Sequence, residues 1–462
     1  QEINKPAVEA TLQLKGAQVE VVSGQVGRTL DLQKNLALVS QQLQSQRDGV
    51  IDLVITNSAP VILDASQQAN LTRAILSQPL TLTLPAQDQG AGPWTIDPQA
   101  LSSMVTFERV QAGGTTQYEV RLKEDLLRAY LSNLGPSLSR PYQNARFTFN
   151  DDTHQLELLQ KATIGRELDI DNSIKSIQEK LYAGEHNIPL VMSYTNPPVT
   201  DQSTGEQLGI KELIHSETSY FYGSDAGRVQ NIQLAASKFH GLLVAPGEVF
   251  SMASALGDIT LDNGYAEAMI ILGDQTIKGV GGGVCQVSTT LFRTAFFSGY
   301  PIVERHAHAY RVYYYEKVAG NRINSKLAGL DATVFVPLVD FKFKNDSSAW
   351  LLMETYVNPS ASSITWKFYS TSDNRRVEWN TTGITNVTPA LDPVYHENPD
   401  LPSGTIKQVD WAAEGADVTV NRTVYQNDAV YLQDTFSTHY LPWADSYEYG
   451  PGTEIPTNNS GQ

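Results

Sequence analysis

Thiols are scarce in this sequence, because Cys285 is the only cysteine among its 462 residues. A single cysteine cannot form a disulfide within the chain. Cytosolic chains of this length often carry several thiols, whereas exported bacterial chains usually keep none, or one that has a task. The scarcity therefore favours an exported protein and directs attention to Cys285.

Long apolar runs are also absent. The sequence has no apolar run of about eighteen residues, the length that a membrane-spanning helix needs. No basic and apolar export signal precedes Gln1. We therefore expect a soluble chain, or a mature form without its export segment, and membrane attachment only through an anchor that this chain does not include.

Basic residues are few, with 33 against 50 acidic residues and a net charge of −17. This charge repels nucleic acids and anionic membrane surfaces, so neither is an expected partner. Hydrophobic residues make up 41% and charged residues 18%, which is typical of globular domains rather than disorder. The length suits about three domains.

An internal repeat organises the first half of the chain. Residues 27–36 read GRTLDLQKNL, and residues 165–174 read GRELDIDNSI. In each copy a Gly-Arg pair leads to an aspartate, Asp31 or Asp169, which can cap a following helix. A predicted hairpin precedes each Gly-Arg pair, and an alternating strand follows each helix. The helices carry apolar residues three and four apart, namely Leu36, Val39 and Leu43 in the first copy and Ile174, Ile177 and Leu181 in the second.

The repeat is similar to a known domain type. Between the copies stand PLTLTLP and WTIDPQAL, followed by a predicted helix at 124–134. With the Gly-Arg and Leu-Asp pairs, these segments resemble the peptidoglycan-binding-type domain found beside VanW and L,D-transpeptidase domains. The resemblance implies two α+β repeats, at 1–76 and 77–215, with peptidoglycan or its stem peptides as partner. The first copy starts at its middle, so an upstream piece is expected. The alternative is a pair of spacer domains.

A glycine run next to the single cysteine is the strongest chemical signal. Residues 279–292 read GVGGGVCQVSTTLF. Gly281, Gly282 and Gly283 allow a sharp turn and close approach to a ligand. The predicted helix 285–298 then begins, which places Cys285 in a first turn whose dipole favours a thiolate and whose free N–H groups can bind an oxyanion.

Five blocks of sequence, in order, resemble the VanW family. They are residues 231–251, 263–271, 279–292, 304–310 and 329–334. The resemblance implies an α+β VanW domain at 218–345, after a polar linker at 200–217. Within it we predict a helix at 229–243 and strands at 266–272, 302–305, 309–316 and 331–337. A β-rich, sandwich-like region at 346–443 and a flexible tail at 444–462 complete an α+β multidomain chain.

The same region contains candidate partners for the thiol. His306 and His308 lie two residues apart, so on a strand both point to one face, and one could act as base for Cys285. Asp331 could orient that histidine. A cysteine at a helix N-terminus with a histidine on a later strand is the arrangement of papain-like and NlpC-like enzymes. Other predicted lining residues are Gln286, Ser288 and Glu267.

Each candidate also has a plainer interpretation. A buried Cys285 can be an inert apolar residue, and the two histidines can be a polar strand end. Asp331 can cap a turn, and His240 beside an apolar helix face is interpreted as structural. Cys285 with both histidines would make a zinc site, but only three ligands are evident, so no metal or cofactor is predicted.

Three functions remain open at this point. The first is an extracellular cell-envelope protein that associates with peptidoglycan, binding or scaffolding at the cell wall. The second is a Cys/His-dependent peptidoglycan amide hydrolase or transpeptidase. The third is a structural subunit of a surface layer or appendage, built through self-association.

Overall fold

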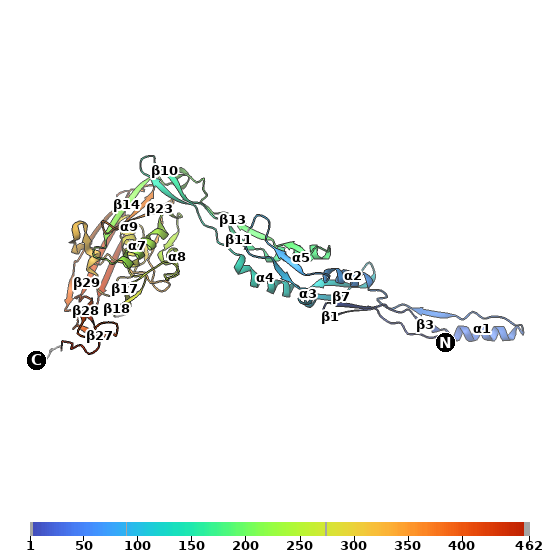
Figure 1. Ribbon diagram of the computed structural model, residues 1–462. Helices are drawn as coiled ribbons and strands as arrows, with labels where there is room; N and C mark the ends of the chain where they lie inside the picture. The colour runs from blue at the N-terminus through green and yellow to red at the C-terminus, as the bar shows by residue number, and fades with distance from the viewer. Residues whose placement is uncertain (1–2, 89, 273–274, 457–462) are drawn as a thin grey trace. The chain divides into compact units, whose positions relative to one another are not determined.

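The computed structural model describes residues 3–88, 90–272 and 275–456. It forms two compact units (Figure 1). Unit 1 comprises Gln1–Gln143 with Thr163–Pro197, and unit 2 comprises Asn144–Ala162 with Pro198–Gln462. Helices and small sheets occur in both units, which confirms the predicted α+β class. The division at 76, 215, 345 and 443 stays a prediction.

Unit 1 carries the Gly-Arg segment and the following helix of both copies, whereas the hairpin at 146–160 before the second Gly-Arg pair belongs to unit 2. The helices of unit 1 are α1 (Leu32–Gln44), α2 (Ser66–Ile75), α3 (Pro98–Met104), α4 (Glu124–Leu138) and α5 (Ile170–Tyr182). Its strands are β1 (Thr11–Lys15), β2 (Gln18–Val22), β3 (Gly27–Leu30), β4 (Ile55–Ser58), β5 (Leu80–Thr83), β6 (Trp94–Ile96), β7 (Val105–Ala112), β8 (Thr115–Leu122), β11 (Gly165–Leu168), β12 (Asn187–Pro189) and β13 (Met192–Thr195).

The two copies share their local structure. Asp31 accepts a hydrogen bond from the Lys34 amide at 3.0 Å, and Asp169 accepts one from the Asn172 amide at 3.0 Å. Both predicted helix caps are therefore confirmed. The Gly-Arg strand pairs antiparallel with the strand after the helix in each copy, β3 with β4 and β11 with β13.

The copies differ in what covers their helices. On α5, the side chains of Ile174, Ile177 and Leu181 are buried, because α4 packs against this helix and β12 pairs with β5. The matching residues of α1 are exposed, with Leu43 at 72%. The prediction of an apolar face on α1 is correct, but among the described residues no element like α4 covers it.

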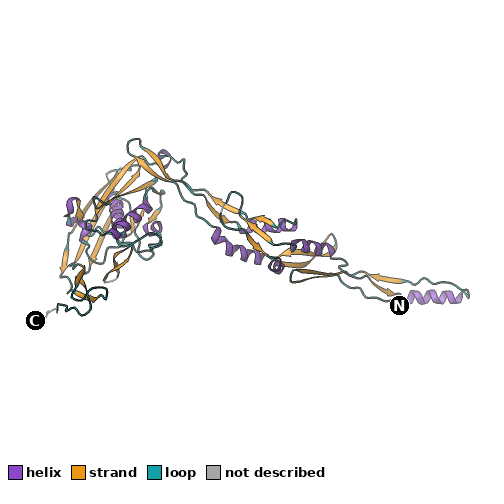
Figure 2. Cartoon of the chain, viewed as in Figure 1, coloured by secondary structure: helices purple, strands orange, loops and turns teal. Residues whose placement is uncertain are grey.

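Unit 2 is richer in strands, as the orange arrows of Figure 2 show. Its helices are α6 (Gly205–Leu208), α7 (Ala226–Phe239), α8 (Met252–Leu256) and α9 (Val284–Phe297), with 3-10 turns η1 (Tyr313–Glu316), η2 (Ala319–Asn321) and η3 (Ser325–Leu327). Its strands up to residue 344 are β9 (Arg146–Asn150), β10 (Gln155–Gln160), β14 (Glu212–Tyr220), β15 (Leu242–Val244), β16 (Val249–Ser251), β17 (Glu267–Leu272), β18 (Gln275–Val280), β19 (Ile302–Glu304), β20 (Lys317–Val318), β21 (Arg322–Ile323) and β22 (Lys342–Lys344). The later strands are β23 (Leu351–Asn358), β24 (Ser363–Ser370), β25 (Arg375–Thr381), β26 (Thr385–Thr388), β27 (Val394–Glu397), β28 (Ile406–Asp410), β29 (Gly415–Gln426), β30 (Ala429–Tyr440) and β31 (Ser446–Tyr449).

One hydrophobic core holds the centre of unit 2 together. Helices α7 and α9 pack on the sheet of order β14-β24-β23-β15. The core also takes Val418 and Val420 from β29 and Tyr440 from β30. The C-terminal β29–β30 hairpin thus packs against α9, which begins with the glycine run and Cys285.

Several predictions of secondary structure in unit 2 are wrong. Residues 444–462 are not simply a flexible tail, because Ser446–Tyr449 form β31, which pairs with β27 and β28. Residues 200–217 are not simply a linker, because they contain α6 and the first part of β14, which pairs with β24. Residues 309–312 are irregular and Tyr313–Glu316 form the η1 turn, so residues 309–316 are not a strand. Residues 331–337 are irregular, with one bridge between Phe335 and Val339. None of the helices in the described ranges combines the length and apolar composition needed to cross a bilayer.

Candidate functional site

The glycine run forms a tight turn between β18 and α9. Gly281 has φ +92° and Gly283 has φ +108°, backbone conformations that side chains other than glycine rarely adopt. A Cβ on Gly282 would lie 2.4 Å from the Met269 carbonyl oxygen, and one on Gly283 would lie 2.8 Å from Arg228 Cγ. Packing within the protein therefore requires glycine at these positions, whether or not a ligand approaches them.

Helix α9 begins directly after this turn, as predicted. Gly283 occupies its N-cap position and offers no side chain to cap the first N–H groups. Cys285 lies in the first helical turn and remains partly exposed. Its Sγ lies 3.6 Å from the Val334 carbonyl oxygen. The thiol is thus held near a helix N-terminus, where the dipole favours its ionised form.

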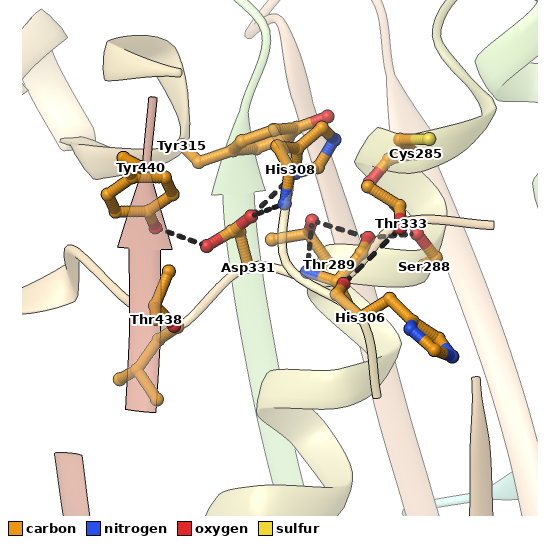
Figure 3. A network of polar contacts seen from close by, with 12 residues as sticks. Cys285, Ser288, Thr289, His306, His308, Tyr315, Asp331, Thr333, Thr438 and Tyr440 are labelled. Atoms are coloured by element: carbon orange, nitrogen blue, oxygen red, sulfur yellow. Dashed lines mark hydrogen bonds and ion pairs between the residues drawn. The ribbon is translucent and has the colours of Figure 1, made fainter. Parts of the chain in front are cut away.

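His308 lies between the carboxylate of Asp331 and the thiol of Cys285 (Figure 3). The imidazole Nδ1 is 2.6 Å from Asp331 Oδ2, and the His308 backbone amide donates to the same oxygen at 2.8 Å. Because the carboxylate accepts, Nδ1 carries the proton and Nε2 is left for the thiol. The sequence prediction that Asp331 orients a histidine therefore has a matching geometry here.

Asp331 is itself held by residues outside this trio. The Tyr440 hydroxyl, from β30, donates to Asp331 Oδ1 at 2.5 Å, and Arg305 Nη2 donates to it at 3.3 Å. Burial alone would raise the pKa of Asp331, but the hydrogen bond from His308 and the charge of Arg305 hold it well below its usual range. The carboxylate is therefore ionised at neutral pH and fixes the orientation of the imidazole.

The same contacts set the protonation of the thiol and the imidazole. Burial lowers the pKa of His308, but the hydrogen bonds to Asp331 and Cys285 outweigh it and raise that pKa to about 10. Burial raises the pKa of Cys285, yet the hydrogen bond and charge of His308 bring it below its ordinary value. The protonated His308 imidazole therefore favours the thiolate form of Cys285.

A cleft of about 620 Å³ opens beside the thiol, with Cys285 and His308 in its lining. The walls come from the loop after α8, the β17–β18 hairpin, the glycine turn and the irregular segments at 307–315 and 333–339. Other lining residues are Ile259, Met269, Val280, Tyr314, Tyr315, Val334, Phe335 and Leu338.

The second predicted histidine lies elsewhere. The imidazole of His306 is 52% exposed, its Nε2 is 3.1 Å from Glu304 Oε1, and its ring points away from the thiol (Figure 3). The prediction that both histidines face one way is wrong, because residues 305–308 are not a strand. The described part of the chain also contains no group of three His, Cys, Asp or Glu side chains able to hold a metal.

The predicted polar lining residues do not reach the cleft. Gln286 is buried and donates to Ser219 Oγ at 2.7 Å, and Ser288 is buried and donates to the Ala332 carbonyl oxygen at 2.5 Å. Glu267 pairs with Lys278 at 2.7 Å. Each of these side chains therefore has a structural contact in this fold.

Sequence reasoning missed two groups that support the site. Arg305 directly precedes His306 in the sequence. Its position beside the two predicted histidines was therefore enough to suggest it as a site residue. Tyr440 lies 109 residues beyond Asp331, and nothing in the sequence connects the two. The ring of Tyr315 also lies next to the His308 ring, with centroids 4.9 Å apart and the two planes tilted by 37°.

Comparison with known families places two domains on this chain. The family described as "VanW like protein" matches residues 227–369, a range that includes Cys285, His308 and Asp331. The family described as "Putative peptidoglycan binding domain" matches residues 1–52. Tyr440 lies outside both matched ranges.

Two curated relatives match part of the chain. "Uncharacterized protein YoaR" of Bacillus subtilis is 36% identical over 135 residues, which are 29% of this chain and 41% of that protein. "Vancomycin B-type resistance protein VanW" of Enterococcus faecalis is 26% identical over 164 residues, which are 36% of this chain and 52% of that protein. The chain thus spans about half the length of these relatives or less.

Two solved G5 domains show a slight likeness. The "IgA1 Protease G5 domain structure" is 18% identical, covers 17% of this chain and 96% of its own, and has a TM-score of 0.11. The "Crystal structure of HP0197-G5" is 14% identical, covers 17% and 99%, and has a TM-score of 0.09. Scores this low support no conclusion about function.

Proposed function

Residues 227–369 of this chain form a VanW family domain, and from this premise we propose that the protein is an exported, cell-wall-associated enzyme that uses Cys285 for acyl transfer. The reaction is hydrolysis or transpeptidation of an amide in a peptidoglycan stem peptide. The observation that carries the proposal is the placement of His308 between Asp331 and the Cys285 thiol at the wall of a cleft.

The chemistry follows the usual division of roles for a cysteine nucleophile. The Cys285 thiolate attacks the amide carbonyl carbon, so that a C–S bond forms and the C–N bond breaks. His308 donates its proton to the leaving amine. Water or a second amine then attacks the thioester, His308 accepts the proton of that nucleophile, and the thiolate is released. Asp331 keeps the imidazole oriented throughout.

The wall association is supported by a separate part of the chain. The match of residues 1–52 to a peptidoglycan-binding family suggests that unit 1 holds the protein on its substrate. The same match favours a second candidate function, in which the chain binds the wall without chemistry. The two candidates differ in whether Cys285 is needed for anything other than packing.

Purified muropeptides and the Cys285→Ala variant separate the two candidates. We expect the unaltered chain to release new amines or form new cross-links, and Cys285→Ala to do neither while retaining its circular dichroism spectrum. His306→Gln is the matched control, since this histidine has no contact with the thiol. Undiminished turnover in Cys285→Ala would remove the catalytic proposal.

Binding to isolated sacculi tests the wall association itself. We expect the full chain and its Cys285→Ala variant to sediment equally with sacculi. Equal sedimentation with no turnover in either form would leave the binding function alone, and no sedimentation of either form would contradict both.

A further inference from the structure

The cleft beside Cys285 is apolar and poor in positive charge. Its walls are mainly aliphatic and aromatic and include Ile259, Val280 and Val334, whose carbonyl oxygen lies 3.6 Å from the thiol. No lysine or arginine stands among the described residues that line it, and Asp258 is its one lining carboxylate. A substrate carboxylate would therefore meet no cation there, apart from the imidazolium of His308 that the reaction itself uses.

Arg228, whose charge acts on the Cys285 thiol, already has contacts with other side chains. Arg228 stacks over the Tyr314 ring at 4.6 Å from its centroid, and its Nη2 donates to Gln286 Oε1 at 3.1 Å. It also contacts Ser224 Oγ. This side chain therefore shapes the wall behind Tyr314 and is not free to bind an anionic substrate group.

Apolar side chains also surround the mouth of the cleft. Leu338 is 77% exposed, Phe335 is 44% exposed and Met269 is 39% exposed, although all three line the cleft. Clustered exposed apolar side chains at the rim of a concave site are typical of ligand-binding grooves. A cleft of about 620 Å³ is within the range of small-molecule sites.

We propose that this cleft takes the acyl side of the scissile bond, and that the stem-peptide group it accommodates is uncharged and aliphatic rather than anionic. This inference rests on the proposed cysteine chemistry and adds the substrate class. The Cys285 thiolate attacks the carbonyl carbon, the bond to the leaving oxygen or nitrogen breaks, and His308 protonates that atom. Water then hydrolyses the thioester, with His308 accepting the proton.

Matched p-nitrophenyl esters test the chain preference on the full protein. The panel is acetate, hexanoate, octanoate and the monoester of adipate, which has the six carbons of hexanoate but ends in a carboxylate. The readouts are the burst of p-nitrophenol and the mass increase on Cys285, with Cys285→Ala as background. We expect the acylation rate to rise by up to about fourfold for each added buried methylene. The adipate monoester should react no faster than acetate.

Variants at the rim of the cleft test whether its apolar side chains cause the dependence of the acylation rate on chain length. Leu338→Ser and Phe335→Ser should reduce the chain-length dependence, lowering the octanoate rate by a larger factor than the acetate rate. Because Leu338 is 77% exposed, its replacement does not threaten folding. Val430→Ser, at an exposed apolar residue of β30 outside the lining, is the control and should retain the full dependence.

The failures of the two proposals are distinguishable. Equal acylation by acetate, octanoate and the adipate monoester would overturn the chain preference and leave the thiol chemistry standing. Absence of Cys285-dependent acylation with every ester would remove the proposed function, and the chain preference with it.

Discussion

Removing the imidazole of His308 tests the central electrostatic claim about this site. The pKa of His308 lies at about 10 against an ordinary 6.5, a difference that corresponds to roughly 5 kcal/mol in favour of the imidazolium. That cation lowers the pKa of the Cys285 thiol against the opposing effect of burial. In His308→Gln the burial remains and the cation is gone, so the pKa of the thiol should rise to its ordinary value or above.

The expected magnitude follows from the ionised fraction. A thiol with a pKa of about 8.5 is roughly 3% ionised at pH 7, so a fully ionised Cys285 has up to about 30 times more thiolate. Thiolates of lower pKa are intrinsically less nucleophilic, with a Brønsted slope of about 0.4–0.5. We therefore expect iodoacetamide labelling at pH 7 to slow by about tenfold in His308→Gln.

The labelling rate measured from pH 5 to pH 11 gives the decisive comparison. In the unaltered chain the rate should level off at a lower pH than for an ordinary thiol, because His308 lowers the pKa of Cys285. In His308→Gln it should continue to rise above that pH. His306→Gln is the matched control and should reproduce the unaltered profile. An unchanged profile in His308→Gln, or an equal change in both variants, would refute the reasoning.

Three further predictions concern stability, measured by urea unfolding of the full chain and followed for the unit that carries the change. Asp331→Asn should lower the free energy of unfolding of unit 2 by about 3–5 kcal/mol, because it leaves the buried Arg305 and His308 cations without their counter-charge; a loss below about 1 kcal/mol would contradict the ion-pair assignment. Gly283→Ala should lower the free energy of unfolding of unit 2 by about 1–3 kcal/mol, since its φ of +108° and the contact with Arg228 both oppose a Cβ. Gly223 has φ +81° and no neighbour within 4 Å, so Gly223→Ala measures the backbone contribution alone. Leu181→Ala should lower the free energy of unfolding of unit 1 by about 2–5 kcal/mol and Leu43→Ala by about 0.5 kcal/mol or less, because only Leu181 is buried. Equal losses in the two variants would mean that α1 is covered in solution.

The local elements of this chain were predictable because their determinants are local. Asp31 and Asp169 cap helices through hydrogen bonds that span three residues, and the 3.6-residue period marks both following helices. The helix at Cys285 was predictable for the same reason, since a glycine turn and a terminal Gly299 fix its two ends. Strand predictions failed at 309–316 and 331–337, where apolar residues contribute to a cleft and core without pairing with a neighbouring strand.

Burial, in contrast, depended on neighbours far away in the chain. Leu43 and Leu181 occupy the same position of the repeat, but only Leu181 has α4 against it. The residues of β14 looked like a polar linker because most side chains in this strand are exposed or only partly buried. Its pairing with β24, about 150 positions later, is what makes it part of the central sheet.

The sequence by itself determined the resemblance of residues 227–369 to the VanW family, the repeat, the glycine turn and a cysteine at a helix start, because motifs and periodicity depend on residues that are close together in the chain. Only the tertiary structure decided that His308 rather than His306 meets the thiol, since the choice depends on which way an irregular segment turns. It also brought Tyr440 from the C-terminal hairpin to Asp331, through packing that no spacing along the chain encodes.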